Sequence, residues 1–311
     1  MRAVGVTRFG GPEVLEAVEL PEPDPGQGEV RIRVAAAAVN PTDTGLRAGR
    51  RAEALAGIPP PYVPGMELAG VVDEVGPGAS FRRGDRVMAI VLPTRPGGGA
   101  QAELVVVPAD SVAPVPEGAS MEQASTLPMN GLTARRALDL LALREGQTIG
   151  VTGAAGAVGG YVIQLALLEG LRVIADASPK DEALVKDLGA DVVVPRGEGA
   201  PEAIRDAAGG GVDGLVDAAL MGPSVLVAIK DGGKLACVRP FGGEPERGIE
   251  VLQVQVSEYA RNQAALERLG RLAGEGKLTL RVAATFPPER AADAHRQLEA
   301  GGTRGRLVIV F

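Results

Sequence analysis

The sequence predicts a two-domain α/β protein that combines a β-rich barrel domain with a domain built on a doubly wound parallel sheet. Three observations predict this fold class. Strand-like runs broken by Gly and Pro fill residues 1 to about 118, and strand and helix patterns alternate from about Ser120 onward. A glycine-rich turn also joins an apolar strand to a helix within residues 149–166.

The N-terminal part has the pattern of a small barrel or sandwich. Turn signals recur about every ten residues, a spacing typical of short antiparallel strands rather than of βαβ units. The segment 78–85 is a loop and turn that leads into one of these strands. The predicted strands cover 29–34, 68–75, 85–91 and 102–107.

From Ser120 the pattern changes to that of a parallel sheet covered by helices on both faces. Helices are predicted at 121–126 and 131–141, and two more within 263–300. Residues 305–310 form a last strand, which must pair with the β-rich N-terminal domain. Strand and helix alternate at 149–152, 158–169, 171–175, 180–188, 191–194, 201–207, 213–217, 222–229 and 234–238.

The glycine turn has the spacing of Gly153, Gly156 and Gly159. Glycine allows a tight turn and a close backbone approach, while the N–H groups at the start of the next helix attract a phosphate. The spacing is G-x-x-G-x-x-G rather than G-x-G-x-x-G, so the usual dinucleotide fingerprint is only partly matched. Because the chain has 44 glycines, a turn without a ligand is the competing interpretation.

Composition excludes several classes of function. With 311 residues, of which 45% are hydrophobic and 23% charged, the chain is long enough for two ordered domains. A net charge of −7 argues against nucleic acid or an anionic membrane as the main partner. No apolar run reaches membrane-spanning length, and the N-terminus has no signal-peptide pattern, so we expect a cytoplasmic protein.

The single Cys237 and the single His295 cannot provide the nitrogen and sulfur ligands that zinc prefers. Cys237 lies in a buried-strand pattern and is interpreted as an inert core thiol. His295 lies in a helical stretch beside Asp293 and Arg296 and is interpreted as a helix-surface residue. Chemistry in this protein would therefore depend on an organic cofactor.

A set of short motifs points to a known family by its order and spacing. These include Asn40-Pro41-Thr42-Asp43, Gly65-Met66-Glu67 and Leu127-Pro128-Met129-Asn130-Gly131, together with segments 97–108 and 291–296 and the glycine turn. Over essentially the whole chain they resemble the zinc-independent, zeta-crystallin-like quinone oxidoreductases of the medium-chain dehydrogenase/reductase superfamily.

The resemblance implies a fold and a domain division. It implies a GroES-like β-barrel catalytic domain at 1–119, completed by 262–311, and an inserted Rossmann domain at 120–261, with an active-site cleft between the two. Zinc-dependent relatives carry a Cys just upstream of the position of Asp43 and a His before the Glu of the Gly-His-Glu motif. This sequence has Asn40 and Met66 there, so a metal-free site is expected.

The resemblance also implies a nicotinamide cofactor, with NADPH favoured over NADH. The ribose-facing position falls on Ala177, where a small residue leaves room for a 2′-phosphate. Asp176 and Asp181 depart from the family pattern, and Lys180 and Arg196 have the alternative interpretation of solvated surface charges. The predicted cofactor-binding residues are Gly153, Ala155, Gly156, Ala157, Val158, Gly159, Ser178, Lys180, Arg196, Ala219 and Val238.

Asn40, Asn130 and Thr133 are the candidate catalytic residues that the resemblance points toward nicotinamide and substrate. An Asn amide can donate a hydrogen bond to a carbonyl oxygen that gains charge as hydride arrives. Alternatively, Asn40 caps a turn before Pro41 and Asn130 begins a helix. Asp43 is expected to make local backbone bonds.

The expected activity is NADPH-dependent reduction of a quinone. Some relatives place a Tyr where this chain has Gly45, so a phenolic proton donor is absent, which suits a quinone better than an enone. Enone or enal reduction and a non-catalytic dinucleotide-binding role remain alternatives. A homodimer or homotetramer is expected, through the sheet edge near Leu235 to Val238 and the run Ile249 to Val256.

Overall fold

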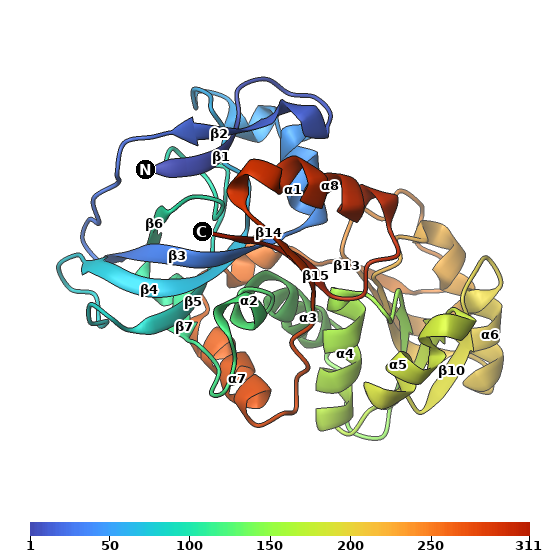
Figure 1. Ribbon diagram of the computed structural model, residues 1–311. Helices are drawn as coiled ribbons and strands as arrows, with labels where there is room; N and C mark the ends of the chain where they lie inside the picture. The colour runs from blue at the N-terminus through green and yellow to red at the C-terminus, as the bar shows by residue number, and fades with distance from the viewer. The chain divides into compact units, whose positions relative to one another are not determined.

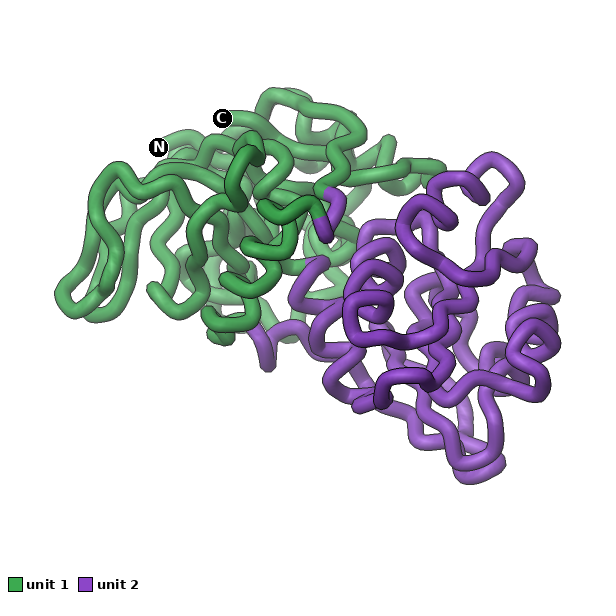
Figure 2. The backbone as a smooth tube through the Cα atoms, turned by 90° about the horizontal axis from the view of Figure 1, so that it is seen from below, with its two compact units in different colours: residues 1–129, 260–276, 280–311 green, residues 130–259, 277–279 purple.

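The computed structural model describes residues 1–311, and the chain divides into two compact units. Figure 2 shows the first in green and the second in purple. The barrel unit comprises residues 1–129, 260–276 and 280–311, and the Rossmann unit comprises 130–259 and 277–279. No helix is long and apolar enough to cross a membrane.

The barrel unit is built on a seven-stranded sheet in the order β14-β15-β3-β4-β5-β7, with β6 also paired to β3. All of its pairings are antiparallel except β14 with β15. The strands are β3 (Glu29–Val39), β4 (Glu67–Val75), β5 (Arg86–Ile90), β6 (Leu104–Pro108), β7 (Val112–Pro114), β14 (Val282–Phe286) and β15 (Arg306–Val310). A separate hairpin-like sheet pairs β1 (Arg2–Val6) with β2 (Leu15–Glu19).

Strand β3, labelled in Figure 1, organises this unit. Its first part, Glu29–Arg33, pairs with β6, while Ala36–Val39 pairs with β15. β3 therefore joins the N-terminal strands to the last strand of the chain. This agrees with the expectation that the strand predicted at 305–310 pairs with the N-terminal domain. Alternate residues such as Val30, Ile32 and Val34 are buried in the barrel core, which is the period-two pattern of a half-buried strand.

Four helices belong wholly to the barrel unit: α1 (Pro41–Arg47), α2 (Met121–Ala124), α7 (Gln263–Gly274) and α8 (Ala291–Ala300). Ser120 begins α2 with a capping box, because its hydroxyl accepts the Gln123 N–H while the Gln123 side chain accepts the Ser120 N–H. Met121 packs against Ala36, Ala38 and Val308 of the sheet.

The Rossmann unit has a six-stranded, fully parallel sheet in the order β10-β9-β8-β11-β12-β13. The strand order reverses between β8 and β11, so the carboxyl ends of these two strands flank the switch point where such folds bind ligands. Its elements are α3 (Pro128–Leu141, from Asn130), β8 (Thr148–Thr152), α4 (Ala157–Leu168), β9 (Arg172–Ala177), α5 (Glu182–Asp187), β10 (Val192–Pro195), α6 (Ala200–Ala207), β11 (Val212–Asp217), β12 (Ile229–Cys237) and β13 (Glu250–Gln253).

The compact units divide at 129–130 and 259–260, near the domain limits at 119–120 and 261–262 that the resemblance implies. The structure differs from the sequence prediction at three places. The segment 222–228 is a 3₁₀-helix, and β14 was not predicted. Residues 235–237 lie in β12, which has neighbours on both sides, so the edge strands of this sheet are β13 and β10.

Candidate active site

The first candidate site is a buried polar cluster where β3 ends and α1 begins. Asn40 is the residue between these elements and is fully buried. Pro41 follows at the first helical position, where its missing N–H costs nothing. The Asp43 carboxylate accepts the backbone N–H of Asn40 at 2.8 Å and that of Gly65 at 3.1 Å. Asp43 therefore makes local backbone bonds, as predicted, and holds the chain at both points.

The Asn40 side chain is oriented by a second carboxylate, that of Glu67 at the start of β4. The Asn40 amide Nδ2 donates to Glu67 Oε1 at 3.0 Å, and the backbone N–H of Met129 donates to Glu67 Oε2 at 2.8 Å. Arg306 Nε lies 4.0 Å from Glu67 Oε1. Because a carboxylate only accepts hydrogen bonds, this contact fixes which end of the Asn40 amide is the nitrogen.

The carboxyl group of Asp43 has a strongly perturbed pKa. Burial raises the pKa of Asp43 to about 7, while its bonds from Asn40 and Gly65 and the charge of Arg306 act in the opposite direction. The nearby Glu67 adds to the increase. Desolvation dominates because the charged form has lost its water without gaining a close ion pair. The cluster around Asn40 thus contains a group that titrates near neutral pH.

The alternative that Asn40 caps the turn before Pro41 agrees with this geometry, and its catalytic role stays a prediction. Asn40 is the N-cap of α1, yet its amide nitrogen donates to Glu67 and only weakly, at 3.5 Å, to Ala38. Asn130 and Thr133 lie three residues apart in α3, on one face of the helix, and are 2% and 8% exposed. Asn130 is the third residue of α3 rather than its first.

The contacts recorded for Tyr62 and Tyr259 are with residues outside this cluster. Tyr62 is partly buried and stacks on Phe9, with ring centroids 5.3 Å apart and an interplanar angle of 6°, in agreement with the predicted packing role. Tyr161 lies in α4, and Tyr259 donates to Asp139 at 2.5 Å within the Rossmann unit.

The second candidate site is the glycine turn between β8 and α4. Gly153 has a φ of +68°, a conformation that favours glycine. Gly156 is the N-cap of α4, and its N–H donates to the Gly153 carbonyl at 2.9 Å. A Cβ on Gly159 would lie 2.4 Å from the same oxygen, so glycine is needed there for the helix to pack on the turn. This backbone fits a diphosphate at the start of α4.

Parallel strands bring the other predicted cofactor residues to the same edge of the sheet. Ala219 and Val238 follow β11 and β12, and Ser178 and Arg196 follow β9 and β10. The Arg196 N–H donates to the Ala177 carbonyl at 2.9 Å, which keeps these two strand ends adjacent. All of them therefore share the carboxyl edge with the glycine turn.

The charged groups near β9 have different environments. Lys180 and Arg196 are exposed, and the charge of Arg196 acts on the nearby Asp176. The Ser178 hydroxyl contacts the Asp181 carboxylate at 2.5 Å. Asp176, in contrast, is 1% exposed and accepts the Ala154 N–H of the glycine turn at 3.1 Å. Burial raises the pKa of Asp176, and the charge of Arg196 partly opposes this shift.

Metal ligands are not grouped anywhere in the chain: no three His, Cys, Asp or Glu side chains are placed to hold an ion. At the two positions of zinc ligands in related dehydrogenases, Asn40 binds Glu67 and Met66 is buried, 4% exposed. These residues do not fit zinc, which prefers thiolate and imidazole.

The predicted burial of Cys237 is confirmed, and the interpretation of His295 as a surface residue was wrong. Cys237 is 3% exposed, and burial raises the pKa of its thiol to about 11. His295 is fully buried in α8 rather than on the helix surface. Its Nδ1 lies 3.3 Å from Arg47 Nη1, and Arg47 also bonds Glu299 at 2.6 Å.

Glu67 and Arg306 were not assigned a role from the sequence. Both are charged residues at the start of apolar strands, and both are buried. A charged residue next to a buried β run indicates that a partner lies nearby, because an unpaired buried charge is costly. The sequence does not show which distant residue is its partner.

Comparisons with known proteins agree with this fold. Residues 26–117 match the family model of the alcohol dehydrogenase GroES-like domain, and residues 188–309 match that of zinc-binding dehydrogenases. The chain is 31% identical to quinone oxidoreductase of Rattus norvegicus, over 100% of this chain and 98% of the relative.

Two solved structures are similar over the whole chain. One, described as an NAD-dependent alcohol dehydrogenase, has 34% identity and a TM-score of 0.88, with 100% of both chains covered. The other, a mycobacterial protein complexed with NADPH, has 30% identity and a TM-score of 0.85, also with 100% of both chains covered.

A GroES-like unit together with a Rossmann unit defines an NAD(P)-dependent oxidoreductase of the medium-chain type. Within that superfamily, the chain belongs to the quinone oxidoreductase family.

Proposed function

We propose that this protein is an NADPH-dependent quinone oxidoreductase that works without a metal ion. The observation that carries the proposal is the Asn40 amide, buried and bonded to Glu67 at 3.0 Å, at a position where zinc-dependent relatives have a cysteine. An oriented amide can stabilise negative charge on a substrate oxygen without a Lewis acid.

When bound, reduced nicotinamide supplies the hydride. The amide nitrogen of Asn40 donates to Glu67 at 3.0 Å and, more weakly, to the Ala38 carbonyl at 3.5 Å. With Glu67 holding the amide in place, the hydrogen on the weaker contact would turn to the quinone oxygen that gains charge. Asn130 and Thr133 remain predicted contacts to nicotinamide and substrate. Both oxygens of Asp43 accept backbone N–H groups, so we assign it a positioning role, and the product oxygens would take protons from water.

Two features support NADPH rather than NADH. Lys180 and Arg196 are exposed cations beside the end of β9, where the 2′-phosphate is expected, and Ala177 is small. Asp176 Oδ1 accepts the Ala154 N–H of the turn, while its Oδ2 is buried without a partner, so the preference for NADPH rests on the cations and on Ala177. The diphosphate would lie on Gly156, Ala157 and Val158 at the start of α4.

Calorimetry with NADPH and NADH tests this cofactor preference. Lys180→Gln and Arg196→Gln should each weaken NADPH about tenfold or more, since a charge-assisted hydrogen bond contributes about 1.5–3 kcal/mol. NADH affinity should change little. Arg268→Gln, which removes an exposed cation in the barrel unit, is the control. Equal losses for both nucleotides would contradict the assignment.

The substrate class is tested by following NADPH absorbance with matched panels of quinones and enones. Rapid turnover of quinones, with little for enones, is the expected result. Turnover of enones alone would instead indicate a carbon–carbon double-bond reductase. NADPH binding without turnover in either panel would indicate a non-catalytic dinucleotide-binding protein.

Asn40→Ala should lower kcat while leaving NADPH affinity unchanged, and full activity of this variant would remove Asn40 from the mechanism.

We also propose that the protein is a homodimer or homotetramer assembled through the free edge of β13. An edge strand presents unpaired backbone groups that a second copy can bind. Val251→Pro would remove an N–H from this strand, and sedimentation equilibrium would then report a smaller species.

A further inference from the structure

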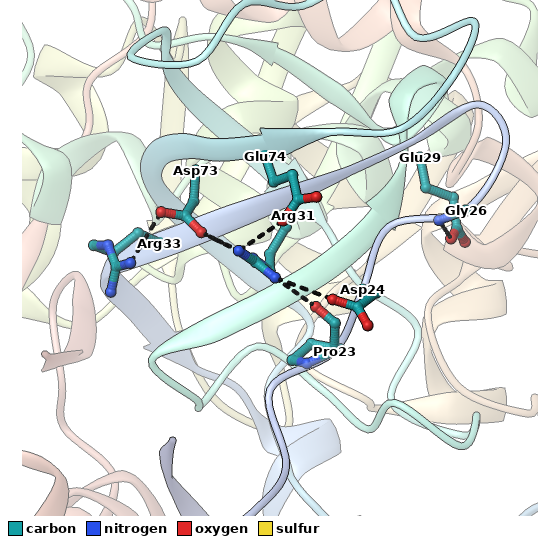
Figure 3. Close-up of polar contacts among 8 residues, drawn as sticks. All are labelled: Pro23, Asp24, Gly26, Glu29, Arg31, Arg33, Asp73 and Glu74. Carbon is teal, nitrogen blue, oxygen red and sulfur yellow. Dashed lines mark hydrogen bonds and ion pairs between the residues drawn. The ribbon is translucent and has the colours of Figure 1, made fainter.

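A charged pocket on the barrel unit lies apart from Asn40 and has no part in the chemistry proposed above. It is open, has a volume of about 720 Å³, and is formed by β3, β4 and the turn that follows β4. Its charged lining residues are Arg31, Arg33, Asp73, Glu74, Arg82 and Arg83. Figure 3 shows the part of this cluster on β3 and β4.

Arg31 is fully engaged within this cluster. Its Nε and Nη2 contact Asp73 Oδ2 at 2.8 and 2.7 Å, and Nη2 also lies 2.8 Å from Glu74 Oε2. Its Nη1 donates to the Pro23 carbonyl at 3.1 Å (Figure 3). The guanidinium holds the pKa of the Asp73 carboxyl below its usual range. Arg31 therefore fixes both carboxylates and has no spare donor for a ligand.

A β-bulge explains why Asp73 reaches two arginines. In the β3–β4 register Arg31 is opposite Glu74 and Ile32 is opposite Val72, which leaves Asp73 as the extra residue. Asp73 Oδ1 accepts from Arg33 Nη2 at 2.9 Å, while the Nε and Nη1 of Arg33 have no partner. Arg33 is 62% exposed, so these donors face the solvent in the pocket.

Arg82 and Arg83 are exposed, and their side chains have no partner in the protein. Their backbone is nevertheless fixed. The Asp85 carboxylate accepts the Arg82 N–H at 2.7 Å, and the Gly84 N–H donates to the Val72 carbonyl at 2.9 Å. The turn thus holds both arginines at the pocket, beside the half-buried Phe81.

The capacity of this pocket to bind an anion comes from its unpaired arginines rather than from a net positive charge. Four guanidinium groups and two carboxylates line it, and Asp24, 3.6 Å from Arg31 Nη1, and Asp85 of the turn bring the formal charge of the cluster to zero. Spare donors on Arg33, Arg82 and Arg83 suit the oxygens of a phosphate, which planar guanidinium groups bind in a bidentate manner. The acidic chain as a whole would repel a nucleic acid, so a small anion is the better match.

We propose that this pocket binds a small molecule carrying a phosphate or diphosphate group, with Arg33, Arg82 and Arg83 as its ligands and Asp73 as the residue that positions Arg33. The site is separate from the proposed cofactor site, because all of its residues belong to β3, β4 and the loop that follows β4.

Calorimetry with inorganic pyrophosphate tests the proposal, using the double variant R82Q/R83Q. Binding should weaken at least tenfold in this variant, while NADPH affinity stays unchanged. Glu74→Gln should strengthen binding a few-fold, because it removes a repelling charge that is half exposed. The control R8Q/R51Q removes two exposed, unpartnered arginines elsewhere in the barrel unit and should bind as the parent protein does.

Pyrophosphate can also occupy the glycine turn, so each measurement is repeated in the Gly156→Asp background, where the added carboxylate repels anions. Binding that persists there and depends on Arg82 and Arg83 supports the proposal. The proposal is wrong if pyrophosphate does not bind in that background, or if R82Q/R83Q and R8Q/R51Q weaken it equally. Binding of a nucleic acid oligomer without any response to pyrophosphate would also overturn it.

Discussion

His295 should make the folded protein sensitive to acid, and its effect can be measured without interference from another histidine. The side chain is fully buried in α8, and burial, aided by the charge of Arg47, lowers its pKa from 6.5 to about 3. Arg47 can only donate, so Nδ1 must be the acceptor and the proton of the neutral ring must lie on Nε2. Nε2 is buried without a partner, and no acceptor is placed to favour the protonated ring.

The magnitude follows from linkage between protonation and folding. Since the folded pKa lies below the unfolded one, the stabilisation is complete above the unfolded pKa and is lost as the pH falls from about 6.5 toward 3. At about 1.36 kcal/mol per pKa unit, the loss between pH 7.5 and 4.5 is about 2.6 kcal/mol. Asp43 acts in the opposite direction: its raised pKa, about 7, makes its contribution grow as the pH falls through 7.

The assay therefore compares wild type with His295→Gln, so that the contribution of Asp43 cancels. Urea unfolding at pH 7.5 and 4.5 gives the free energy of unfolding of each protein. Between these two pH values the wild type should lose about 2.6 kcal/mol more of this free energy than His295→Gln does. If His295→Gln does not fold, proton NMR of the wild-type ring still tests the reasoning. A native ring that titrates near pH 6.5, or a difference that is independent of pH, would refute it.

Three further results are expected. Gly159→Ala should weaken NADPH binding more than tenfold by calorimetry, because its Cβ would meet the Gly153 carbonyl oxygen at 2.4 Å. Glu67→Gln should lower kcat with little change in NADPH affinity, and should cost about 1–3 kcal/mol in urea unfolding, because Gln keeps one acceptor oxygen and so either the Asn40 amide or the Met129 N–H loses its acceptor. Cys237 should resist alkylation in the native protein and react on unfolding, since its thiol is buried and its pKa is about 11.

The first of these results has a matched control variant, and each of the other two has an outcome that would contradict it. Gly199→Ala adds a Cβ in open space at a negative φ and should leave NADPH affinity intact, so an equal loss in both glycine variants would point away from the turn. For Glu67→Gln, a fall in NADPH affinity as large as that in kcat would indicate a general structural role. Alkylation of native Cys237 at the rate of a free thiol would contradict its burial.

Local features of the sequence were sufficient to predict much of the fold. The glycine turn follows from the spacing of Gly153, Gly156 and Gly159, because each position has a local steric requirement that only a small residue meets. The interpretation of Asp43 as a backbone acceptor is also confirmed. A carboxylate three residues after an N-cap residue commonly accepts the backbone N–H of that residue.

Long-range pairings could not be predicted in this way. Glu67 and Arg306 meet across the barrel, and no local pattern shows that these two charges belong together. For His295 the signal was present: Ala291 and Leu298 lie four and three residues away on the same helical face, and both pack into an apolar cluster of the barrel unit. The neighbouring charges of Asp293 and Arg296 lie on the other side of the helix, where they bond each other.

The pairing of β3 with β15 has a consequence for how the chain folds during synthesis. Ala36 to Val39 leave the ribosome early, yet their partners, Leu307 to Val310, emerge only after the whole Rossmann unit. Residues 130–259 are contiguous and can fold as soon as they are made, whereas the barrel must wait with one apolar strand uncovered. Slow translation or premature termination near residue 300 would therefore leave a folded nucleotide-binding half attached to an aggregation-prone remnant.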